Sequence, residues 1–162
     1  MIKFLKFFFV SLAVIFLATC KKYPENNLWF HNPENILPGN YKITSFTVND
    51  VDCVAYINNI INDDLKRYDW DFIYESKSEQ KINISPSPPP GGIYGYYSFL
   101  NKKKELQIVW RNFDSNQRLI SNIFQEEKTT WEIVRFSKKV KKSPILKLKR
   151  NYNGKVYVIQ FN

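Results

Sequence analysis

Side chains that could carry out chemistry are few in this chain. There are two cysteines, Cys20 and Cys53, and one histidine, His31. His31 has only Glu34 near it in the sequence, and a single carboxylate nearby favours an ordinary surface histidine over a metal site. Cys53 has neither a histidine nor a cation beside it to activate its thiol, so we interpret it as a small buried residue. No metal site is predicted.

The sequence also lacks the motifs of common catalytic sites. It contains no glycine-rich phosphate loop, no Gly-x-Ser-x-Gly elbow and no His/Cys metal pattern. Asp63 and Asp64 are neighbours in a helix-like segment, where adjacent side chains point apart, and Glu126-Glu127 is interpreted as a pair of turn charges. We therefore expect a protein that is not an enzyme and that uses no cofactor.

The first residues have the three-part pattern of an export signal. Lys3 and Lys6 precede an apolar run from Phe7 to Leu17, and small residues follow as far as Cys20. The apolar run is shorter than the roughly 20 residues that a membrane-spanning helix needs. The pattern predicts a signal peptide over residues 1–19.

The residues around the expected cleavage point, Leu17-Ala18-Thr19-Cys20, resemble the lipobox of bacterial lipoproteins. Thr19 departs from that pattern, in which Gly, Ala or Ser is usual. The resemblance implies that Cys20 is the lipidated first residue of the mature chain, since two or more acyl chains give stable anchorage. It also implies that the protein is located in the periplasmic leaflet of an outer membrane, because Lys21 stands where an aspartate often signals inner-membrane retention. Surface exposure, an uncleaved anchor and a plain secretory signal stay open as alternatives.

Composition after the signal indicates one folded domain rich in strands. Hydrophobic residues make up 44% and aromatic residues 17% of the chain, enough apolar surface to offset the entropy of ordering a domain. Aromatic and β-branched residues favour strands. The formal net charge of +9 becomes +7 when Lys3 and Lys6 leave with the signal. In an exported protein this charge favours an anionic membrane surface or solubility, so no nucleic acid partner is expected.

Residues 20–38 are rich in Asn and Pro without periodicity, so we interpret them as a lipidated N-terminus and tether that leads into a domain over 39–162. Apolar residues at helical spacing predict a short helix between Val51 and Arg67. Leu119, Ile120, Ile123 and Phe124 indicate another short helix packed on the sheet. Eight strand-like runs are predicted at 41–49, 70–75, 81–85, 93–100, 106–110, 129–136, 145–149 and 156–161.

Several of these runs alternate with period two, and polar turns separate them. Asn151 to Gly154 joins the last two runs as a hairpin. Regular short strands with polar turns are typical of an antiparallel meander that closes into a barrel or folds as a sandwich. The sequence predicts a mainly antiparallel all-β fold of about eight strands.

Three segments look like parts of the small lipocalin-like lipoproteins of Bacteroidetes. These are Leu37-Pro38-Gly39-Asn40-Tyr41-Lys42-Ile43, Thr130-Trp131-Glu132-Ile133 and the closing hairpin from Ile145 to Ile159. Tyr41 stands where the family pattern has a tryptophan. The resemblance implies an eight-stranded up-and-down lipocalin-like barrel and a pocket for a small apolar molecule.

Two functional hypotheses follow for such a barrel. In the first, aromatic residues line a pocket for one small apolar ligand, and arginines recognise its carboxylate or phosphate. The candidates are Tyr94, Tyr96, Trp110, Arg111, Trp131 and Arg135. In the second, the aromatic residues fill the barrel as core, the arginines are exposed, and the protein contacts an envelope partner through its surface. In both, the lipid on Cys20 binds the membrane.

Overall fold

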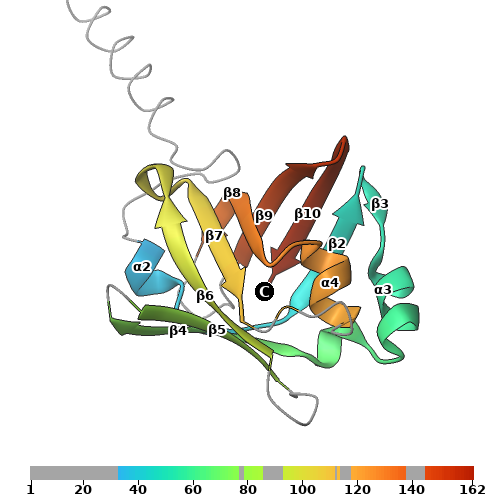
Figure 1. The fold of residues 1–162 in the computed structure, drawn as a ribbon, viewed down its shortest axis with the longest axis horizontal. Coiled ribbons are helices and arrows are strands. Elements are labelled where there is room, and N and C mark those ends of the chain that lie inside the picture. Colours follow the sequence, from blue (N-terminus) through green and yellow to red (C-terminus); the bar gives the residue numbers. More distant parts are fainter. Residues whose placement is uncertain (1–32, 77–78, 86–92, 112, 114–117, 138–144) are drawn as a thin grey trace, which may run out of the picture.

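The computed structural model describes residues 33–162 apart from 77–78, 86–92, 112, 114–117 and 138–144. The strands are β1 Gly39–Tyr41, β2 Ile43–Val48, β3 Val51–Asp52, β4 Asp69–Ser76, β5 Glu79–Ser85, β6 Ile93–Leu100, β7 Glu105–Trp110, β8 Lys128–Ser137, β9 Ile145–Tyr152 and β10 Lys155–Phe161. The helices are α2 Pro33–Ile36, α3 Val54–Ile61 and α4 Arg118–Phe124. All strands belong to one sheet, in the order β1-β4-β5-β6-β7-β8-β9-β10-β2-β3 (Figure 1).

One continuous segment of chain joins the two ends of this sheet. From β4 to β10 every strand pairs antiparallel with the next, whereas β1 pairs with β4 and β2 pairs with β10. Only Lys42 separates β1 from β2, and its N–H donates to the Asn162 carbonyl at 2.8 Å while the Asn162 N–H donates back at 3.0 Å. The sheet therefore curls into a barrel (Figure 1). The expected mainly antiparallel all-β fold is confirmed, as one curled, half-barrel sheet of ten strands where the sequence predicted about eight.

Alternation along the strands directs aromatic side chains into this barrel. In β8, Thr129, Trp131 and Ile133 are buried while Lys128 and Thr130 are exposed. β5, β7 and β10 follow the same rule, and the strands bury an aromatic core together with α4. Its largest fully buried members are Trp70, Trp110, Trp131, Tyr41, Phe46, Phe72, Phe124 and Phe161.

The helices cover the two ends of the barrel. α3 and α4 pack on each other at one end, on the right of Figure 1. α2 lies at the other end, where the Glu34 carboxylate is 3.0 Å from Lys103 Nζ in the connection between β6 and β7. Both helices that the sequence indicates are present, and α3 ends early because Asn62 adopts a left-handed conformation (φ 55°).

Residues 33–38, which the sequence analysis assigned to the tether, belong to the folded domain. Pro33 is buried in α2, and the side chain of Leu37 is fully buried in the core. A helix of four residues has no periodicity that a sequence pattern could show. The described domain therefore includes residues ahead of Gly39.

Candidate functional site

The six predicted ligand-binding residues lie on two different faces of the sheet. Trp110 and Trp131 point into the barrel and are fully buried. Tyr94 is 38% exposed on the outer face, and the Arg111 guanidinium lies 5.2 Å from the centroid of the Tyr96 ring. Because residues two apart on a strand share a face, Tyr94 and Tyr96 are both on the opposite side of the sheet from Trp110.

Arg135 also lies on the outer face. It is opposite Lys147 in the β8–β9 register, beside the buried pair Phe136 and Leu146. A bulge between Ile133 and Arg135 shifts the register at this point. Together with Tyr94, Tyr96 and Arg111 it is separated by the sheet from the two tryptophans, so the six residues do not form one pocket.

The tryptophans pack instead around a phenylalanine from α4. The Phe124 ring centroid is 4.9 Å from that of Trp110, 5.6 Å from Trp131 and 6.1 Å from Trp70. These are edge-on or tilted contacts, a geometry that stabilises aromatic pairs by about 0.5–1.5 kcal/mol beyond the burial of their area. Of the aromatic residues that suggested a ligand pocket, the two tryptophans are thus used to pack a helix of the same chain into the barrel.

Arg150, which the sequence analysis did not select, fixes the end of that helix. Its side chain is only 9% exposed, although it carries a charge. Arg150 Nη1 donates to the Phe124 carbonyl at 2.7 Å, and Nη2 forms an ion pair with Glu126. The guanidinium also lies 4.3 Å from the centroid of the Tyr152 ring. A cation bound to the last carbonyls of a helix is stabilising, so Arg150 holds the C-terminal end of α4 against β9.

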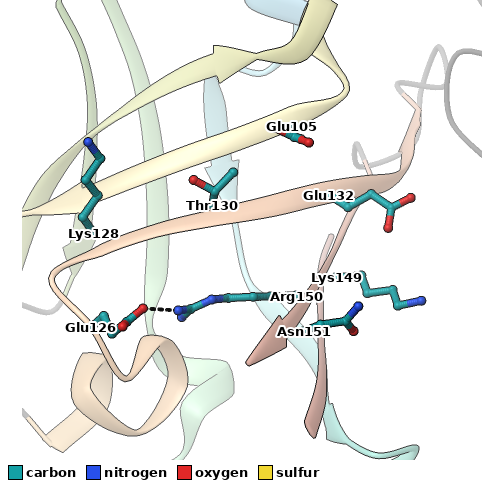
Figure 2. Close-up of a pocket in the computed structure, with 8 residues that line it drawn as sticks. All are labelled: Glu105, Glu126, Lys128, Thr130, Glu132, Lys149, Arg150 and Asn151. Carbon is teal, nitrogen blue, oxygen red and sulfur yellow. Dashed lines mark hydrogen bonds and ion pairs between the residues drawn. The ribbon is translucent and has the colours of Figure 1, made fainter. Parts of the chain in front are cut away.

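A polar pocket of about 370 Å³ is lined by this ion pair and by residues on the outer face of β7, β8 and β9 (Figure 2). Its lining consists of Glu105, Glu126, Lys128, Thr130, Glu132, Lys149, Arg150 and Asn151. Acidic and basic residues balance in this lining, and it contains no cysteine, serine or histidine that could act as a nucleophile or base. Figure 2 shows Arg150 pointing toward Glu126 and Lys149 pointing away from it. The geometry is that of a structural clamp.

Two buried polar atoms lie on neighbouring strands near the end of the barrel where α2 lies, away from α4. Within the described residues, neither the Tyr97 hydroxyl on β6 nor Gln80 Oε1 on β5 has a hydrogen-bond partner. Burial raises the pKa of Tyr97 above its ordinary value, and the Glu34 carboxylate raises it further. The hydroxyl therefore stays protonated at neutral pH and is able to donate a hydrogen bond.

Three further residues that the sequence analysis considered are Cys20, His31 and Cys53. Cys20 and His31 lie outside the described residues. Cys53 is partly exposed rather than buried, and its thiol lies 3.4 Å from the Val51 carbonyl. Among the described residues, no three His, Cys, Asp or Glu side chains gather closely enough to bind a metal ion. The described helices are also all too short or too polar to cross a membrane.

Comparison with known proteins places this chain in no family. No family model and no curated protein matches it. Among solved structures it is similar to an uncharacterized protein from Bacteroides eggerthii, with 16% sequence identity and a TM-score of 0.42, over 77% of this chain and 98% of that one. A likeness this distant carries no information about function.

Proposed function

We propose that this chain is a bacterial envelope lipoprotein, similar to the lipocalin-like lipoproteins of Bacteroidetes, whose barrel is a packed scaffold. Acyl chains on Cys20 anchor it to a bilayer, in the periplasmic leaflet of the outer membrane, and its outer surface contacts other envelope components. The anchor is supported by the signal pattern of residues 1–19 and the cysteine that follows. The scaffold is supported by one observation, the insertion of Phe124 among three tryptophans.

The packing of α4 favours this proposal over a ligand in the centre of the barrel. α4 buries Leu119, Ile120, Ile123 and Phe124, and Arg150 binds its last carbonyl. A ligand that occupied the same space would have to displace these apolar side chains. Each of them contributes about 1.5–3 kcal/mol when it is buried. The helix therefore competes with any ligand for the space between the tryptophans.

Metabolic labelling with radioactive palmitate tests the anchor. Wild-type protein expressed in its own host should be labelled and should fractionate with membranes, whereas Cys20→Ala should lose both properties. Cys53→Ala is the matched control, because it removes the other cysteine and should leave labelling unchanged. Labelling that persists in Cys20→Ala would show that the proposed anchor is wrong.

A second function, the binding of a small molecule with one polar group, is favoured by the Tyr97 hydroxyl and Gln80 Oε1. Buried polar atoms without protein partners are uncommon, and bound water or a ligand often satisfies them. Native mass spectrometry of the lipoprotein extracted from its host separates the two functions. A mass equal to that of the acylated protein alone supports the scaffold. A retained small molecule that Tyr97→Phe releases supports the ligand-binding function.

A further inference from the structure

Three polar side chains form a row across neighbouring strands at the end of the barrel where α2 lies. Tyr74 on β4 pairs in register with Gln80 on β5, and Gln80 comes directly before Lys81, which pairs with Tyr96, so it lies opposite Tyr97 on β6. All three belong to the inward-facing set of their strands, because the residue two positions away on the same face is buried in each case. Tyr74 is also close enough to raise the pKa of Tyr97. We call these three residues the polar row.

The two inner members of the polar row are deeply buried and lack hydrogen-bond partners. Gln80 is 8% exposed and Tyr97 is 3% exposed. In the part of the chain that the structure describes, neither Gln80 Oε1 nor the Tyr97 hydroxyl has a partner, so the two do not bond to each other. The buried Tyr41 hydroxyl, by contrast, donates to the Leu37 carbonyl at 2.8 Å. Two unpaired polar atoms at this depth cost free energy that a hydrogen-bonding group between them would recover.

The two unpaired atoms define the chemistry of such a group. Gln80 Oε1 only accepts hydrogen bonds, whereas the Tyr97 hydroxyl keeps its proton and donates, because burial raises its pKa. A single hydroxyl group matches both, since its oxygen accepts from Tyr97 while it donates to Gln80. A carboxylate has no proton to donate to Gln80. A cation is disfavoured as well, because the Glu34 carboxylate that acts on Tyr97 is already paired with Lys103 at 3.0 Å.

The surroundings of the polar row are apolar and extend to the surface. The Tyr97 ring centroid is 5.3 Å from that of Phe72 and 6.3 Å from that of Phe99. Tyr74 is 41% exposed and Phe99 is partly exposed, so the row runs from the core to solvent. A sugar would bring further hydroxyl groups that aromatic rings leave unpaired. One hydroxyl on an apolar skeleton fits this environment better.

We propose that the Tyr97 hydroxyl and Gln80 Oε1 bind the hydroxyl group of a small, uncharged and mostly apolar alcohol at the α2 end of the barrel. The proposal rests on the small-molecule function described above and names the class of its ligand. Phe124 of α4 packs on Trp110 and Trp131, away from the polar row. The alcohol therefore does not take the place of the α4 side chains, and a packed α4 is compatible with this site.

Titration with a simple alcohol and its isomeric ether tests the site. The chain of residues 20–162 with Cys20→Ala is titrated with hexanol or with butyl ethyl ether, and binding is followed by NMR of the backbone amides. We expect saturable binding of hexanol, with the largest shifts on β5 and β6. The ether accepts from Tyr97 but cannot donate to Gln80, so it should bind about fivefold or more weakly. Tyr97→Phe and Gln80→Leu should each weaken hexanol binding by a similar factor.

Tyr56→Phe is the matched control, because it removes a phenol hydroxyl from a residue that is 63% exposed and should bind hexanol like the parent chain. Tyr97→Phe removes a buried hydroxyl without a protein partner, so its urea midpoint should not fall, and weak binding would not reflect unfolding. Equal affinity for hexanol and the ether, unchanged binding in Tyr97→Phe, or no saturable binding of hexanol would overturn the alcohol site. A retained molecule of another class that Tyr97→Phe releases would still support the small-molecule function, so the two proposals fail separately.

Discussion

Arg150 connects parts of the molecule that lie far apart in the sequence. It extends from β9 to the last carbonyl of α4 and to Glu126 in the turn that follows, and its guanidinium rests on Tyr152. A cation that is only 9% exposed needs such partners, because burial without them is costly. The residue therefore couples the position of α4 to the sheet.

Replacing Arg150 should loosen this coupling. Arg150→Leu leaves the Phe124 carbonyl without its donor and Glu126 without its cation, so we expect the free energy of unfolding to fall by about 2 kcal/mol. Urea unfolding followed by tryptophan fluorescence measures the loss. Arg67→Leu, which breaks the exposed pair with Asp63, is the control and should lower the free energy of unfolding much less than Arg150→Leu does. Equal losses would contradict the role given to Arg150.

Among the elements, α4 depends most on its surroundings. It has seven residues, too few for a stable helix in isolation, and four of them are buried. Its stability must therefore come from packing in the barrel and from Arg150. In return, Phe124 supplies the ring around which Trp70, Trp110 and Trp131 pack.

Removal of that ring should be among the most destabilising single changes. Phe124→Ala creates a cavity between three tryptophans and should lower the free energy of unfolding by about 3–5 kcal/mol, with a red shift of tryptophan emission as water reaches the indoles. Calorimetry and fluorescence give the two readouts. Tyr56→Ala is the control, because Tyr56 is 63% exposed and should be nearly neutral. A Phe124→Ala barrel as stable as the parent would contradict the packed scaffold.

The sequence was most informative about the strands, because alternation of buried and exposed residues appears directly in segments such as β8 and β10. The candidate site was harder to predict. Alternation separates Tyr94 and Tyr96 from Tyr97, but it does not say which set points inward. The Arg150 clamp depends on the β8–β9 register and on where α4 ends. The register and the end of α4 both arise from tertiary contacts, which a short sequence motif does not reveal.

For the molecule as a whole, residues 37–48 both close the barrel and fill part of it. The segment 39–48 pairs with β4 and then with β10. Just before it, Leu37 is fully buried, and its carbonyl accepts a hydrogen bond from the Tyr41 hydroxyl at 2.8 Å. Residues ahead of Gly39 thus contribute to the stability of the entire domain.

Two truncated chains test this boundary. A chain of residues 39–162 lacks α2 and the Leu37 side chain, so we expect its free energy of unfolding to be lower by about 3 kcal/mol or more than that of a chain of residues 20–162. A chain of residues 33–162 retains both and should match the chain of residues 20–162. Thermal unfolding of the three proteins measures the difference. If the two truncated chains unfold at the same temperature, α2 is not part of the cooperative unit.

The closure at Lys42 also bears on how copies of this protein meet one another at high concentration. An open sheet would offer the free N–H and C=O groups of β4 or β10 to its neighbours, which is a route to aggregation. Here the two outermost strands of the sheet, β1 and β3, have three and two residues. Exposed Val51 in β3 is flanked by Asp50 and Asp52, charges that oppose pairing with a second copy. The joined sheet therefore opposes edge-to-edge assembly between copies of the protein.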